Sequence, residues 1–206
     1  MKKLTLLFVA LAGFAALKAQ DVKTVFNSEE VVWFGLDFTK TKLIGVTDEK
    51  PDVIVKEYLE AWNQPMLYER DKFPIEGTFR KITAKFDPEV IQTLNKKVTR
   101  ETLFGDTETI LTTAAIQDAV SQYPMGAKKQ GLGLVFFIES FNKKKKLATA
   151  QVVFFDIATH KVLLAKRVTG EPGGGGLKYY WANSVSNMFK TISSTLYDVW
   201  KKEASK

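Results

Sequence analysis

The chain has 206 residues, of which 45% are hydrophobic, with a formal net charge of +7, one histidine and no cysteine. This length favours a single domain with a sizeable core. The lack of cysteine excludes disulfides, thiol chemistry and the lipidated cysteine of a bacterial lipoprotein. One histidine cannot build a multi-histidine metal centre, and no cofactor-binding motif stands out. We therefore expect no metal and no cofactor.

The amino terminus has the form of a secretory signal peptide. Lys2 and Lys3 precede an uncharged apolar run over residues 4–17, and Ala19 is a small residue of the kind that signal peptidase prefers. The run is shorter than the roughly 20 residues that a membrane-spanning helix needs. The sequence therefore predicts that Met1–Ala19 is a cleaved export signal and that the chain has no transmembrane anchor.

The rest of the chain is expected to be periplasmic, or secreted. Residues 20–30 are polar and are interpreted as a short lead-in, and residues 31–206 as a single globular α/β domain. Removal of the signal peptide takes away three lysines and lowers the net charge from +7 to +4. Such a modest excess leaves peripheral contact with an anionic membrane surface open without requiring it.

The first half of the domain alternates between strand and helix patterns. Apolar residues at every second position predict a strand over 31–39. Pro51 begins a helix whose apolar stripe includes Trp62, and Pro65 is expected to end or bend that helix. Three further elements follow in the pattern: a strand over 79–86, a helix after Asp87-Pro88-Glu89 with Asp87 as its cap, and a helix from Thr112 or Thr113. A strand over 98–104 is also predicted.

The last third carries the clearest signals. Three β-rich runs with short connections, over 132–141, 147–158 and 161–169, predict an antiparallel meander. Apolar residues from Leu177 to Trp200 recur at helical spacing and predict a long final helix. The expected fold is therefore α/β with some α+β character: a mixed sheet with a carboxy-terminal antiparallel meander, covered by amphipathic helices.

A cluster of glycines directly before the final helix is the first candidate binding site. It comprises Gly173, Gly174, Gly175 and Gly176. A P-loop would end in Lys-Ser/Thr, which is missing here, so either a sharp turn with close backbone packing or binding of an anion or partner remains. Tyr179 and Tyr180 are expected to face outward as contact residues, whereas Trp181 belongs to the apolar stripe.

A run of lysines between two strands is the second candidate. Lys143, Lys144, Lys145 and Lys146 can contact an anionic surface, or they can form a solvated hairpin tip that discourages edge pairing. A site for single-stranded nucleic acid would need aromatic residues between the lysines for the bases to stack on, and this run has none. We therefore expect no nucleic-acid partner.

Acidic residues within apolar strands are the remaining enzymatic option. Asp37 and Glu139 are unusual in such runs, and a hydrolase built on two carboxylates would need them to converge in one cleft. Solvation at a sheet edge is the alternative. His160, in the turn after Asp156, cannot complete a nucleophile system alone. No residue is therefore predicted to be catalytic.

Three features together resemble exported proteins of gram-negative envelopes. They are the strand VVWFGLDFT, the hairpin VVFFDIATHKVLLAKRVTG with the glycines that follow, and the final helix near Trp181. Their layout is similar to the α/β domain of periplasmic assembly factors such as the TolB amino-terminal domain and the curli-secretion lipoprotein. The resemblance covers residues 31–38 and 131–200 and carries over no catalytic residue. The chain lacks the anchoring cysteine of the lipoprotein members.

These observations favour a non-enzymatic exported domain that binds another envelope component, either a protein or a cell-wall polymer. A small-molecule or lipid-binding protein is the alternative, and it would show a sizeable cavity between sheet and helices. A hydrolase that uses only Asp and Glu is the third reading.

Overall fold

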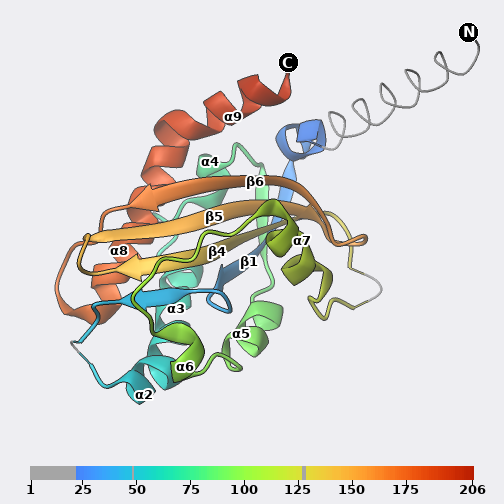
Figure 1. The fold of residues 1–206 in the computed structure, drawn as a ribbon. Coiled ribbons are helices and arrows are strands. Elements are labelled where there is room, and N and C mark those ends of the chain that lie inside the picture. Colours follow the sequence, from blue (N-terminus) through green and yellow to red (C-terminus); the bar gives the residue numbers. More distant parts are fainter. Residues whose placement is uncertain (1–21, 48, 127–128) are drawn as a thin grey trace, which may run out of the picture.

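A computed structural model describes residues 22–47, 49–126 and 129–206, and the signal peptide expected at Met1–Ala19 lies outside them. The chain forms a six-stranded mixed sheet in the order β3-β1-β4-β5-β6, with β2 also beside β4 (Figure 1). The strands are β1 (Glu30–Asp37), β2 (Lys42–Ile44), β3 (Thr83–Phe86), β4 (Leu132–Asn142), β5 (Leu147–Asp156) and β6 (Lys161–Gly170). This arrangement confirms the predicted mixed α/β fold.

The sheet is parallel in its first half and antiparallel in its second. β1 runs parallel to both β3 and β4, and β2 runs parallel to β4. β4, β5 and β6 form the antiparallel meander predicted from their short connections. Strands β4 and β5 are buried along nearly their whole length, because helices cover both faces of the sheet.

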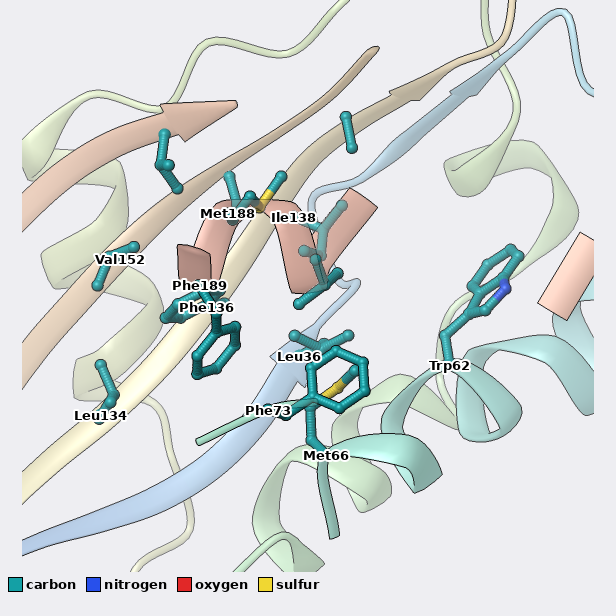
Figure 2. Close-up of a cluster of buried hydrophobic side chains, with 14 of the residues drawn as sticks. Leu36, Trp62, Met66, Phe73, Leu134, Phe136, Ile138, Val152, Met188 and Phe189 are labelled. Atoms are coloured by element: carbon teal, nitrogen blue, oxygen red, sulfur yellow. The ribbon is translucent and has the colours of Figure 1, made fainter. Parts of the chain in front are cut away.

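The helices form one layer on each face. The larger core joins the sheet to α3 (Leu59–Tyr68), α4 (Ile75–Thr78) and α8 (Gly176–Thr191), and a smaller core joins it to α5 (Glu89–Asn95) and α7 (Thr113–Ser121). The remaining helical segments are α2 (Pro51–Val53), η1 (Ile54–Tyr58), α6 (Arg100–Leu103), η2 (Ile192–Leu196) and α9 (Tyr197–Ala204). Figure 2 shows Phe136 of β4 beside Phe189 of α8 in the larger core, with stacked rings 5.3 Å apart.

The predicted final helix is present and runs without a break from α8 through η2 to α9 (Figure 1). Its middle, η2, is a π-helical turn, which is a feature found frequently at functional sites. Trp181 is fully buried in α8 and stacks on Phe141 with a centroid distance of 4.5 Å, as its place in the apolar stripe predicted.

Two buried asparagines replace a missing strand beside the end of β1. The β3 pairing ends at Phe86 opposite Trp33, so later backbone groups of β1 have no strand partner on that side. Asn63 accepts from Leu36 N and donates back to Leu36 O, and Asn95 accepts from Phe38 N. Buried backbone groups need such partners, so the two side chains complete the sheet.

Several predicted boundaries differ from the structure. The predicted strand over 98–104 is wrong: Arg100–Leu103 form helix α6, because Thr99 caps that helix through a reciprocal bond with Thr102, and only Phe104 makes an isolated bridge to β2. Pro65 does not end its helix, which continues to Tyr68.

Two further segments are also revised. The 79–86 strand is shortened to Thr83–Phe86, because Arg80 has a φ of +52° that is incompatible with a strand. Asp87 does not cap α5, since its carboxylate pairs with Lys129.

The segment expected to be a polar lead-in is helical over residues 22–27. Val25 is fully buried in the larger core, and Phe26 contacts the ring of Tyr197 edge-on. Lys81 fixes the end of this helix, because its ammonium donates hydrogen bonds to the carbonyl oxygens of Val25 and Ser28. The segment is therefore a packed part of the domain.

Candidate functional site

A surface pocket of about 630 Å³ lies along α8, directly beside the glycine cluster. Its walls come from three parts of the chain that are far apart in sequence: the connection between α3 and α4, the glycine loop, and one face of α8 with η2. Its lining residues are Asp71, Lys72, Pro74, Thr78, Gly173, Gly174, Asn183, Ser186, Asn187, Phe189, Lys190, Ser193 and Ser194. Eight of these thirteen residues carry a hydroxyl, amide or ammonium group, although carbon atoms make up more of the exposed wall than polar atoms do.

The glycine loop is held against α8 by side-chain amides. Asn183 donates to the carbonyl oxygen of Gly173 at 2.7 Å, and Asn187 donates to that of Glu171 at 2.8 Å. The Gly173 amide in turn donates to Tyr180 O. The loop wall of the pocket is therefore fixed by hydrogen bonds and not by apolar packing.

Two of the four glycines have conformations that favour glycine. Gly174 has a φ of +89° and Gly176 a φ of +71°. A Cβ at Gly174 would lie 2.6 Å from Asn183 Nδ2, whereas one at Gly173 or Gly175 would meet nothing within 4 Å. The sharp-turn interpretation thus accounts for Gly174 and Gly176, because the left-handed backbone favours glycine at both positions and the close approach of Asn183 requires it at Gly174.

The opposite wall contains a polar atom without a partner. Thr78 is fully buried and lines the pocket, and its Oγ1 makes no hydrogen bond within the part of the chain that the structure describes. Burying a hydroxyl without a bond costs roughly 1–3 kcal/mol. Lys72 lies on the same wall. Its Nζ atom is 5.4 Å from the centre of the ring of Tyr179, which follows the glycine loop in the sequence.

The π-helical turn η2 forms the far end of the pocket. Ser193 and Ser194 both line it. The Arg80 guanidinium donates to Ser193 O at 2.8 Å and to Gly77 O at 2.7 Å, which ties η2 to the end of α4. Arg80 keeps its left-handed backbone because these contacts hold it, and non-glycine residues in this region are uncommon and cluster at functional sites.

The two tyrosines beside the loop differ from each other. Tyr179 is 44% exposed, as predicted, and Lys178 also lies over its ring. Tyr180 is half-buried, packs against the larger core and contacts Trp181 edge-on. Of the two predicted contact residues, Tyr179 has the more open side chain.

The lysine run lies apart from the residues that line the pocket, at the tip of the β4–β5 hairpin. Lys144 lies 3.7 Å from Asp106, and Lys145 lies 3.0 Å from Glu108. Lys146 has a φ of +51° in the turn. Acidic residues of the neighbouring coil thus offset part of the charge on which an anionic-surface contact would depend.

Glu139 is a structural anchor. It sits where the β4–β5 register shifts and is fully buried. Its carboxylate accepts from Arg167 Nε at 2.6 Å, from Gln151 and from the backbone amide of Leu111. These bonds satisfy the buried charge and attach the coil before α7 to the sheet.

Asp37, at the carboxyl end of β1, is buried with a different set of partners. Its carboxylate accepts from the backbone amide and hydroxyl of Thr39 and from the Tyr123 hydroxyl at 2.7 Å. Burial raises the pKa of Asp37, and these hydrogen bonds oppose the shift only in part. Burial also raises the pKa of Tyr123, and the neighbouring Asp37 carboxylate raises it further.

The two acids do not form a hydrolytic pair in an open cleft. Asp37 and Glu139 are 1% and 0% exposed, and each spends its oxygens on its own partners. A pocket of about 390 Å³ borders Tyr123 and Thr39, and neither acid lines it. Among the described residues, no group of three or more His, Cys, Asp and Glu could hold a metal ion.

His160 occupies the turn between β5 and β6 with a φ of +57°. Thr159 donates twice to Asp156, which forms the predicted turn, and the imidazole lies 3.3 Å from Ser121 O. Over the described ranges, no helix is both long and apolar enough to cross a membrane.

The fold and this site define an α/β domain with a polar surface pocket beside a glycine loop. No protein-family model and no curated protein matches the sequence. Among solved structures, the hypothetical protein CT253 from Chlamydia trachomatis is similar, with 10% identity over 85% of this chain and 99% of that chain and a TM-score of 0.34. A similarity at this level carries no argument about function.

Proposed function

We propose that this chain is an exported, non-enzymatic domain of the cell envelope, and that it binds another envelope component in the pocket along α8. One observation carries the proposal: the pocket of about 630 Å³ is lined by hydroxyl, amide and ammonium groups and by Gly173 and Gly174 of the glycine loop. Pockets with converging polar groups are the usual places for recognition. The amino-terminal pattern of residues 1–19 supports export.

The pocket suits binding better than hydrolysis. Its only carboxylate is that of Asp71, so the residues that line it supply no pair of acids. Carbon atoms make up more of the exposed pocket wall than polar atoms do, but the sole large apolar lining residue, Phe189, is only 1% exposed, so no large hydrophobic side chain is open to a lipid chain. A polar ligand or partner segment is the occupant that this lining complements.

Two experiments test the proposal. Fractionation of cells that express the full chain should place a shortened protein, processed near Ala19, outside the cytoplasm. Sedimentation with a purified envelope fraction should then carry the processed protein down. A full-length protein that stays in the cytoplasm would overturn the proposal.

A matched pair of variants connects binding to the pocket. Ser194→Trp fills the end of the pocket, and Thr195→Trp changes the adjacent exposed residue, which does not line it. We expect Ser194→Trp to abolish co-sedimentation and Thr195→Trp to preserve it, with similar melting temperatures. Equal binding by the two variants would show that the pocket is not the binding site.

A further inference from the structure

The length and lining of the pocket point to the chemistry of its occupant. The helix residues that line it, Asn183, Ser186, Asn187, Lys190, Ser193 and Ser194, follow one another at intervals of three and one, which is one face of a helix. Eleven positions separate Asn183 from Ser194, so this face is about 16 Å long at 1.5 Å per residue. The occupant is therefore an extended molecule.

The lining complements a sugar better than a peptide. Extended peptides are recognised mainly by a free strand edge or by apolar grooves for helix side chains. This pocket lies on helices and loops, and its apolar side chains are those of Pro74 and Phe189. By contrast, hydroxyl groups both donate and accept, and amides offer both roles in one plane, so they match the hydroxyls and acetamido groups of amino sugars.

The buried hydroxyl of Thr78 is a second, independent observation. A fully buried polar side chain without a partner calls for an explanation, and of the five such atoms among the described residues only Thr78 Oγ1 belongs to a residue that lines the pocket. Thr78 lines the pocket opposite the amides of α8, but its Oγ1 atom is almost completely inaccessible, so a bound hydroxyl or amide group completes its hydrogen bonding only after the side chain turns toward the pocket.

The charges in the pocket add a preference for acid groups. Lys190 lies on the α8 wall and donates to the neutral Asn187 side chain. Lys72 lies on the facing wall, 3.7 Å from Glu69 and over the Tyr179 ring. Against these two ammonium groups the lining carries one carboxylate, that of Asp71. The walls therefore have a net positive charge.

Building on the proposed function, we infer that the pocket binds a carboxylate-bearing amino-sugar glycan strand, with Lys72 and Lys190 receiving the carboxylates and the amides and hydroxyls receiving the sugar. Glycan strands of alternating N-acetylglucosamine and N-acetylmuramic acid have this chemistry where their stem peptides have been removed and the lactyl carboxylates are free. Direct polar contacts give specificity and the two lysines give salt sensitivity.

Calorimetry with two matched tetrasaccharides tests the inference. One alternates N-acetylglucosamine and N-acetylmuramic acid without peptides, and the other is the tetramer of N-acetylglucosamine, which lacks only the lactyl groups with their carboxylates. We expect the acidic tetrasaccharide to bind at least tenfold more tightly. The double variant Lys72→Gln/Lys190→Gln should remove this preference, whereas Lys201→Gln/Lys202→Gln, with the same charge change on exposed residues of α9, should preserve it.

Each other outcome overturns the inference. Equal affinity for the two sugars, or a preference that survives the loss of Lys72 and Lys190, would contradict the role of the carboxylates. Binding of neither sugar would exclude a glycan. The proposed function would survive that last result if envelope sedimentation remained sensitive to Ser194→Trp, and the occupant would then be a protein.

Discussion

The Asn183 side-chain amide donates to the carbonyl oxygen of Gly173 across 2.7 Å, and this bond fixes the glycine loop as one wall of the α8 pocket. The Asn183 side chain also restricts position 174 to glycine, because a Cβ atom on Gly174 would lie 2.6 Å from Asn183 Nδ2. The loop conformation and the shape of the pocket therefore depend on each other.

Substitutions at two neighbouring glycines should separate these effects. We expect Gly174→Ala to lower the free energy of unfolding by about 1–3 kcal/mol and to weaken binding, since it combines a φ of +89° with the clash. Gly173→Ala, with open space around its Cβ, should change the free energy by less than about 0.5 kcal/mol. Chemical denaturation of both variants measures the difference, and equal losses would contradict the predicted role of Gly174.

Thr78 offers a test that separates binding from folding. Replacement by the isosteric valine removes a buried hydroxyl that has no hydrogen-bond partner among the described residues. We expect Thr78→Val to melt at the same temperature as the wild type or above it, because no bond is lost. The same variant should bind the acidic tetrasaccharide more weakly. A fall in melting temperature with unchanged binding would assign the hydroxyl a purely structural role.

The buried carboxyl of Asp37 predicts a pH dependence. Burial raises its pKa in the folded state above the usual value of 3.8. At pH values between 3.8, the pKa in the unfolded chain, and the raised pKa in the folded chain, the folded chain holds the proton more strongly than the unfolded chain does. The free energy of unfolding therefore falls as the pH rises through this window. We therefore expect Asp37→Asn to raise the melting temperature at pH 7 and to raise it less near pH 4.

Thermal denaturation across this range, with the exposed Asp118→Asn variant as a control, measures the effect. A constant difference between the wild type and Asp37→Asn at all pH values would show that the carboxyl does not titrate as described.

Lys81 predicts the opposite slope in alkaline solution. Burial, with a smaller contribution from Lys201, lowers the pKa of Lys81 from 10.5 to about 8. The unfolded chain then holds the proton more strongly between these values, so this residue adds stability as the pH rises from about 8 to 10. The wild type should gain stability relative to Lys81→Met over this interval. Denaturation at pH 7.5 and 9.5 checks the trend, and a parallel response would contradict it.

The predictable parts of the fold are those with local patterns. The meander and the final helix follow from alternation and from helical spacing within continuous runs, and both are present. The strand predicted over 98–104 failed because the capping pair Thr99 and Thr102 outweighs a short β-rich pattern. Of the two outcomes expected at Pro65, an end of the helix is not found, because the helix continues beyond this proline to Tyr68.

The candidate site could be predicted only in part. The glycines and Tyr179 stood out by composition, and the structure places Gly173 and Gly174 in the pocket wall. On the facing wall, Lys72 lies in a charged connection without periodicity and Thr78 at the end of the four-residue helix α4, and the approach of both to α8 is a tertiary contact. A buried hydroxyl without a partner has no sequence signature at all.

Photo-crosslinking inside cells tests the central claim most directly. A photoreactive amino acid at Ser194, within the pocket, is compared with one at the exposed Lys201 of α9, which lies outside the lining. We predict an adduct with an envelope component from position 194, spread over a range of sizes and reduced to a narrow band by digestion of glycan strands, and none from position 201. No adduct at 194, or the same adducts from both positions, would contradict the claim that this pocket binds the envelope.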